Sequence, residues 1–165
     1  MSITGDPAED RGIIEDPILG GRVFMLSSKT FRIMGRLLSE SIGRNGVDAL
    51  LWNLGYRYGA ALGNRVRRAT QSINESVIVL TNSARRSGWG VPAVDVSSAP
   101  EKIGVTFNSC VFCEDEAGEK GSKCFFLAGI LAGVAESIYG RSFKVSEIEC
   151  RAAGAEVCKF VIEPS

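Results

Sequence analysis

The chain has 165 residues, of which 45% are hydrophobic and 23% charged, and its 19 basic and 19 acidic side chains cancel. This composition is ordinary for a globular protein, and the length predicts one domain with its own core. A formal charge of zero excludes a strong field that would attract nucleic acid or an anionic membrane. We therefore expect no direct nucleic-acid partner.

Histidine is absent from the sequence. Its absence removes serine and cysteine nucleophiles that depend on imidazole, imidazole acid–base catalysis, and every histidine-ligated metal or haem. The glycine-rich stretches GYRYGAALG and GEKGSK match neither dinucleotide-binding nor P-loop spacing. The sequence thus predicts no catalytic residue, favours a binding protein over an enzyme, and leaves enzymatic activity undecided.

The start of the chain, MSITGDPAEDRGIIEDP, is acidic and lacks the basic and apolar segments of a signal peptide. We expect residues 1–17 to form a flexible arm and residues 18–165 to form a single domain. The longest apolar run, CFFLAGILAGVA from Cys124, is too short to cross a bilayer about 30 Å thick. We therefore expect a cytoplasmic protein without a membrane span, whose five cysteines stay reduced.

The first half of the domain predicts helices. After a short strand over 21–27, apolar residues at helical spacing predict one helix over 29–43, ended by Gly43, and a second over 47–68. Ser72 and Glu75 have the spacing of a capping box, which predicts a third helix that runs to about residue 87.

Three glycines recur every fourth residue in the second of these helices, at Gly55, Gly59 and Gly63. Each costs helix stability, about 1 kcal/mol relative to alanine. A ridge without side chains compensates by letting a second backbone or a ligand approach closely. Of these two readings we favour tight helix–helix packing.

The second half predicts a sheet interrupted by one helix. Strands are expected over 91–96 and from 102 onwards, where Ile103, Val105 and Phe107 alternate onto one face. An apolar helix over 124–139 follows, and two strands over 143–151 and 157–163 are joined through Gly154. The predicted fold class is α+β: an antiparallel sheet with helices packed on one face.

Two cysteines flank this last connection. Cys150 and Cys158 each lie four residues from Gly154, so a hairpin centred there would set them opposite one another. Opposed residues have Cβ atoms about 4.5–5.5 Å apart, which suits two ligands of one metal ion or a disulfide. Reducing surroundings disfavour the disulfide, and the spacing alone leaves metal binding and simple burial equally open.

Several stretches together resemble a known family. They are RVFMLSS, LGYRYGAALG, FNSCVF, KCFFLAGILAGVAESIYG and VSEIECRAAGAEVCKFVI. They are similar to the 4-vinyl-reductase domain, also called the hydrocarbon-binding domain, which is related in fold to TRAPP trafficking-complex subunits. The resemblance covers about 21–162 and is most specific in its last third.

The resemblance implies a zinc site. In phenol-responsive transcription activators that carry this domain, three cysteines and one glutamate bind zinc, and the matching residues here are Cys124, Glu147, Cys150 and Cys158. Three thiolates and a carboxylate are acceptable zinc ligands. Glu147 and Cys150 are an odd number of positions apart, so a regular strand would aim them at opposite faces. The site therefore requires a bulge near the strand end or a curled glutamate side chain.

Cys110 and Cys113 form a C-x-x-C motif that the resemblance does not explain. They could build a four-cysteine site with Cys150 and Cys158, or form a redox pair that senses oxidants. We favour the set with Cys124 and Glu147 as the metal site.

The resemblance also implies an apolar small-molecule ligand. Phenol sensors of this family contact their ligand through a histidine, which this chain lacks, so a more wholly apolar or tetrapyrrole-like ligand is expected. We expect a sensor or carrier domain; the alternatives are a component of tetrapyrrole vinyl reduction or a cysteine-based redox sensor. A homodimer is expected, paired through N-terminal helices and the glycine ridge. Aromatic residues that could line the pocket are Trp52, Tyr56, Trp89, Phe107, Phe112 and Phe126.

Overall fold

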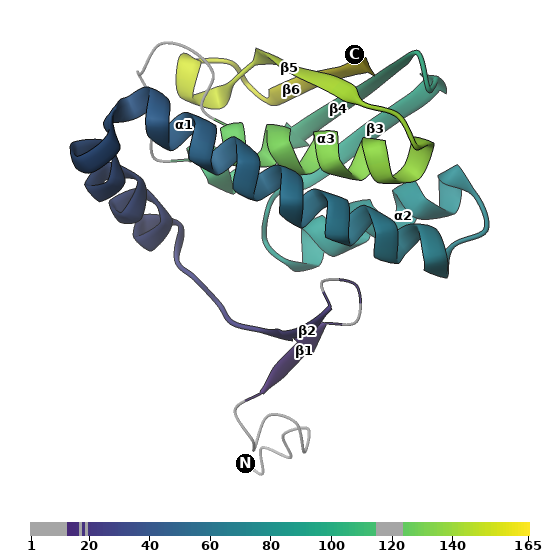
Figure 1. Ribbon diagram of the computed structural model, residues 1–165, viewed down its shortest axis with the longest axis horizontal. Helices are drawn as coiled ribbons and strands as arrows, with labels where there is room; N and C mark the ends of the chain where they lie inside the picture. Colours follow the sequence, from purple (N-terminus) through teal and green to yellow (C-terminus); the bar gives the residue numbers. More distant parts are fainter. Residues whose placement is uncertain (1–12, 17, 19, 115–123) are drawn as a thin grey trace.

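The computed structural model describes residues 13–16, 18, 20–114 and 124–165. Its centre is a four-stranded antiparallel sheet in the order β3-β4-β6-β5 (Figure 1). A separate two-stranded hairpin precedes it, made of β1 (Ile14–Asp16) and β2 (Gly21–Val23). The predicted arm over 1–17 lies largely outside the described residues. The sheet strands are β3 (Val91–Ser98), β4 (Lys102–Asn108), β5 (Phe143–Glu149) and β6 (Cys158–Pro164).

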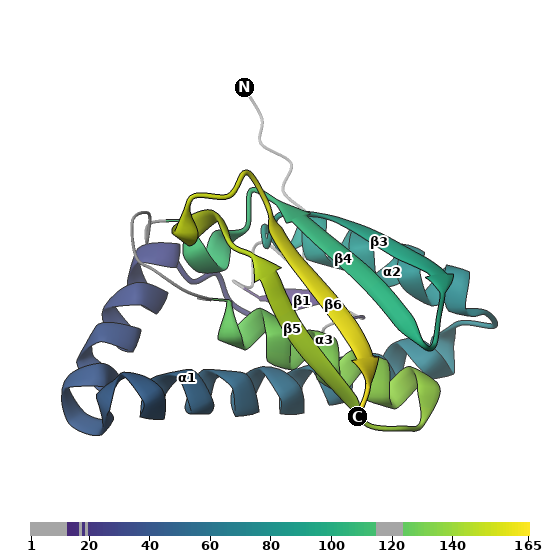
Figure 2. The ribbon, with the colours of Figure 1, turned by 90° about the horizontal axis from the view of Figure 1, so that it is seen from above.

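Alternation of apolar residues turns one face of this sheet towards the helices. Ile103, Val105 and Phe107 of β4 are buried, as predicted, and pair with buried residues of β6. The buried side chains of the two central strands form the core against α3. An antiparallel sheet with helices on one face confirms the predicted α+β class (Figures 1 and 2).

The two predicted N-terminal helices form one bent element, α1 (Ser28–Ala69). Gly43 marks the bend, with φ 73° and ψ 163°, a conformation that favours glycine. Figures 1 and 2 show the first part of α1 turned sharply away from the long second part. The predicted helix end at Gly43 is therefore correct in position, but the chain resumes a helix directly after it.

The capping box begins α2 (Ile73–Arg86). The hydroxyl of Ser72 accepts a hydrogen bond from the backbone N–H of Glu75 at 3.2 Å. The carboxylate of Glu75 accepts one from the backbone N–H of Gln71 at 2.7 Å. These bonds satisfy donors that the first turn leaves unpaired, which is why the sequence signal located the helix start.

Helix α3 (Phe125–Tyr139) lies between the sheet and α1 (Figure 1). Side chains on both of its faces are buried, in agreement with its almost wholly apolar sequence. The glycine ridge of α1 packs here: a Cβ on Gly55 would overlap the carbonyl of Phe126, and one on Gly59 the carbonyl of Ile130. Gly129 of α3 lies in the same way against Trp52 of α1.

This packing decides between the two readings of the ridge. It serves helix–helix contact within the chain, as favoured, and is therefore covered by α3. The expectation that the same ridge forms a dimer interface is wrong, because the glycines cannot contact a second chain while α3 occupies them.

Two 3₁₀ turns flank the sheet at one end: η2 (Val111–Cys113) follows β4, and η3 (Arg151–Ala153) connects β5 to β6. Gly154 ends η3 in the left-handed conformation, with φ 96°. The pairing of β5 with β6 shifts by one residue between Glu147 and Glu149, which is a β-bulge. Within the described ranges, no helix is long and apolar enough to cross a membrane.

Candidate metal centre and ligand cavity

Six potential ligand side chains meet at the end of the sheet that carries η2 and η3. Each comes from an element boundary, where the backbone departs from regular pairing. Two flank η2, one caps α3, one lies beside the bulge of β5, one caps η3 and one begins β6. In that order they are Cys110 and Cys113, Cys124, Glu147, Cys150 and Cys158.

The structure brings the favoured ligand set together. The ligand atoms of Cys124, Glu147, Cys150 and Cys158 all lie within 4.8 Å of one another. The Sγ atoms of Cys124 and Cys158 are 3.7 Å apart. A tetrahedral zinc ion with bonds of about 2.3 Å to sulfur separates two ligand sulfurs by about 3.8 Å. The set therefore fits a divalent ion in donor chemistry and in spacing.

The bulge places Glu147 in this set. It inserts one residue on β5 between Glu147 and the segment that leads to Cys150, so both side chains reach the same side. Oε2 of Glu147 accepts a hydrogen bond from the backbone N–H of Cys124 at 3.2 Å. This carboxylate thus lies at the N-terminus of α3, where the helix dipole favours negative charge.

Cys110 and Cys113 form a second possible set, but with a different partner from the one expected. Their ligand atoms group with those of Cys124 and Cys158, and Cys150 is not among them. The Sγ atoms of Cys110 and Cys124 are 3.7 Å apart, and those of Cys113 and Cys158 are 3.2 Å apart. All five cysteines are buried and none forms a disulfide.

Burial controls the protonation of these thiols in the metal-free protein. Burial raises the pKa of Cys150 to about 12, the Glu147 carboxylate adds to the rise, and the backbone N–H of Ala152 opposes it. Contacts with Cys110 and Cys113 raise the pKa of Cys124 and of Cys158, whereas hydrogen bonds from Cys110 and its neighbours lower the pKa of Cys113. A metal ion must therefore displace protons from several thiols when it binds.

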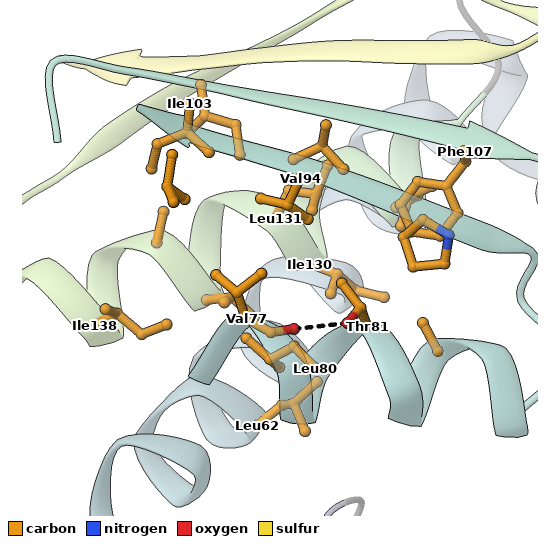
Figure 3. Close-up of a pocket in the computed structure, with 18 of the residues that line it drawn as sticks. Leu62, Val77, Leu80, Thr81, Val94, Ile103, Phe107, Ile130, Leu131 and Ile138 are labelled. Atoms are coloured by element: carbon orange, nitrogen blue, oxygen red, sulfur yellow. Dashed lines mark hydrogen bonds between the residues drawn. The ribbon is translucent and has the colours of Figure 1, made fainter. Parts of the chain in front are cut away.

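A separate apolar cavity of about 110 Å³ lies between the sheet and the helices (Figure 3). Its walls come from α2, α3, β3 and β4, with Leu62 of α1 at one side. Polar side-chain groups occur only at Thr81, Trp89 and Tyr139 among its lining residues. The hydroxyl of Thr81 donates to the carbonyl of Val77 at 2.8 Å, so it does not offer its proton to a ligand.

The predicted pocket residues divide between several places. Trp89 and Phe107 line the apolar cavity. Phe112 and Phe126 line a second, more polar cavity of about 230 Å³ beneath the first part of α1. Trp52 and Tyr56 line neither of these cavities and stack on each other, with ring centroids 5.4 Å apart.

The sequence analysis overlooked the α2 side of the apolar cavity. Ile73, Val77, Leu80 and Ala84 all line it and follow helical spacing, three or four residues apart. That apolar stripe was visible in the sequence. It could have indicated an α2 face turned to the interior, but not that the interior would be left unfilled.

Comparison with known proteins gives the class to which this fold and this cysteine cluster belong. The family model of the vinyl-4-reductase domain matches residues 103–164, from β4 to β6. The chain therefore carries a domain of this family, and the resemblance to the 4-vinyl-reductase family is confirmed. The matched segment contains all six candidate ligands.

Two curated relatives come from Methanocaldococcus jannaschii. The Uncharacterized protein MJ0745 is 29% identical over 133 residues, which are 81% of this chain and 66% of the relative. The Uncharacterized protein MJ0150 is 23% identical over 118 residues, which are 72% of this chain and 65% of the relative. The chain thus spans just under two thirds of the length of these relatives.

Three solved structures share the fold. The phenol-responsive sensory domain of the transcription activator PoxR has a TM-score of 0.77 at 15% identity and covers 99% of this chain and 92% of its own. A vinyl-4-reductase family protein from M. jannaschii has 0.65 at 19%, covering 100% and 99%. A trafficking protein particle complex subunit 3 from Naegleria fowleri, covalently bound to palmitic acid, has 0.62 at 10%, covering 84% and 95%. The last confirms the TRAPP-subunit-like architecture.

Proposed function

We propose that this protein is a small-molecule-binding domain, a sensor or carrier, that holds an apolar ligand in the cavity between α2, α3 and the sheet. The cavity itself carries the proposal, because a native core seldom leaves such a volume unfilled. The similarity in fold to a phenol-responsive sensory domain supports the same class of function.

The size of the cavity narrows the ligand. An apolar cavity of about 150 Å³ can bind benzene, whereas drug-sized ligands occupy about 300–1,000 Å³. The volume of about 110 Å³ therefore supports a single ring or a short aliphatic chain. A tetrapyrrole would require α2 to move away from the sheet.

One polar group is available to such a ligand. Tyr139 lines the cavity, and its hydroxyl is buried without a hydrogen-bond partner among the described residues. A buried hydroxyl without a partner costs free energy that a ligand oxygen can recover. Tyr139 would thus take the role that a histidine has in the phenol sensors of the family.

The test uses Trp89 as the reporter. The chain has two tryptophans, so Trp52→Phe leaves Trp89, in the cavity wall, as the only one. Titration of this variant with toluene is expected to give a saturable change in fluorescence. Adding Val94→Phe should weaken binding at least about tenfold, because Val94 points into the cavity and the larger ring fills it (Figure 3).

The matched control is Val91→Phe. Val91 lies on the same strand, is 45% exposed and does not line the cavity, so its substitution should leave toluene binding unchanged. Equal binding by the two variants, or no saturable signal, would contradict the proposal. Reduction of a vinyl tetrapyrrole with NADPH by the purified protein alone would instead favour the enzymatic alternative.

We further propose that Cys124, Glu147, Cys150 and Cys158 hold a structural zinc ion. The spacing of their ligand atoms supports the proposal. The ion would supply a crosslink between the start of α3 and the η3 end of the sheet, and a closed set of four protein ligands leaves no open position for catalysis.

Dimerisation is proposed through a different surface from the glycine ridge. Large apolar side chains are exposed on the segment before α1 and on its first part. A contiguous exposed apolar surface of this kind is typical of an interface with another protein. A second copy of this chain is the proposed occupant, and the exposed residues are Phe24, Met25, Leu26, Ile33 and Leu37.

A further inference from the structure

Two possible metal sites share the same two sulfur atoms. Each site is a group of four side chains whose ligand atoms lie within 4.8 Å of one another. Cys124 and Cys158 belong to both groups, whereas the outer pairs do not merge into one larger group. The outer pair of the first group is Cys110 and Cys113; that of the second is Glu147 and Cys150.

This arrangement matches two tetrahedra with a common edge. Two ions that share an edge are bridged by two ligands, and for sulfur that edge is about 3.8 Å long. The Sγ atoms of Cys124 and Cys158 are 3.7 Å apart. The Sγ atom of Cys110 is also 3.7 Å from that of Cys124, the length of a further tetrahedral edge.

We propose that the cluster holds two divalent metal ions bridged by the thiolates of Cys124 and Cys158. Cys110 and Cys113 complete the tetrahedron of one ion, and Glu147 and Cys150 complete that of the other. This inference rests on the proposed zinc site and adds a second ion to it. Thiolate-rich donor sets select zinc and similar soft ions over magnesium or calcium.

Burial and charge support a second ion. Cys110 and Cys113 are 0% and 2% exposed, so ionised thiolates there would have no water to solvate them. When the second ion binds, each of these two thiols releases its proton to solvent. The two charges of the ion neutralise the two new thiolates, so the net charge of the buried cluster does not rise.

The C-x-x-C motif then has a function. Beside a single ion held by the other four ligands, Cys113 would be a buried bystander whose sulfur lies 3.2 Å from a ligand sulfur of Cys158. A close contact between two sulfurs is ordinary when both bind the same ion. The second ion would tie the end of β4 to α3 and β6.

Native mass spectrometry of the full chain loaded with zinc tests the proposal by stoichiometry. Two ions per protomer are expected for the unsubstituted chain and one for the double variant Cys110→Ser/Cys113→Ser. The matched variant Cys150→Ser, at the opposite end of the cluster, should also retain one. Cys158→Ser removes a bridge and should lose both.

The outcomes separate this inference from the single zinc site. One ion in the unsubstituted chain, unaffected by Cys110→Ser/Cys113→Ser, would overturn the second ion and uphold the first. A single ion lost in that double variant, no ion at all, or a Cys113–Cys158 disulfide in freshly prepared protein would overturn both.

Cadmium-113 NMR of the unsubstituted chain gives a readout that needs no variant to fold. Two resonances of equal intensity are expected, one from a site with four sulfurs and one from a site with three sulfurs and an oxygen, each split by the other through the bridging thiolates. A single resonance would overturn the proposal.

Discussion

Glu147 shows how one backbone irregularity assigns a side chain to a site. In a regular strand it would face away from Cys150, three positions later. The bulge between Glu147 and Glu149 corrects the direction, and the N–H of Cys124 then holds the carboxylate at 3.2 Å. The ligand spacing required either such a bulge or a curled side chain, and the structure contains the bulge.

At the same scale, Cys150 makes the stability of the metal-free protein depend on pH. Burial raises its pKa from 9.0 to about 12, so the folded state holds the proton more tightly than the unfolded chain does. The resulting stabilisation is fully present below pH 9 and is lost as the pH rises to about 12. Urea midpoints of the metal-free protein should therefore fall across this window.

The control is Cys150→Ser, which should flatten this dependence. A slope identical to that of the unsubstituted protein would show that Cys150 is not the group responsible. The zinc-loaded protein should behave in the opposite sense and lose stability as the pH falls, because protons then compete with zinc for the thiolates and the carboxylate.

At the scale of elements, α1 and α3 are held together by glycines from both helices. Gly55 and Gly59 of α1 face carbonyls of α3, and Gly129 and Gly133 of α3 face carbonyls of α1. This reciprocal contact brings the two backbones close and offsets the low helix propensity of glycine. It also positions α3, whose first residue follows the candidate ligand Cys124.

Gly59→Ala should therefore destabilise the protein. Its Cβ would overlap the backbone of Ile130, and the expected loss in the free energy of unfolding is about 1–3 kcal/mol. Gly35→Ala is the matched control in the same helix, since nothing lies within 4 Å of a Cβ there. It should stabilise by about 0.5–1 kcal/mol. Chemical denaturation measures both, and equal effects would contradict the packing described.

At the scale of the whole molecule, the first part of α1 is where a second chain is expected. Ile33 and Leu37 are 57% and 58% exposed and lie one turn apart on α1. Phe31 anchors this part to the domain by contacts with Phe112 and Phe126, at ring-centroid distances of 6.1 and 5.8 Å. The exposed apolar face is thus held in place by its other side.

The double variant Ile33→Glu/Leu37→Glu should convert a dimer into a monomer, because it places four charges at a two-fold apolar interface. Ile78→Glu on α2, at a position that is 60% exposed, should leave the dimer intact. Sedimentation velocity at micromolar concentration gives the mass of each. A monomeric unsubstituted protein would refute the proposed interface.

The sequence by itself determined what depends on local pattern. The alternation of Ile103, Val105 and Phe107 placed a half-buried strand, Ser72 and Glu75 placed a helix start, and Gly43 placed the end of a helical segment. Each of these signals acts through contacts within a few residues along the chain, so each can be read without knowledge of the fold.

Only the tertiary structure decided which distant segments meet. It gave the glycine ridge of α1 to α3, left the apolar stripe of α2 facing a cavity, and set Cys110 and Cys113 against Cys124 and Cys158. The physical reason is that these contacts join residues far apart in sequence, whose distances follow from how sheet and helices pack together. No local spacing in the chain specifies those distances.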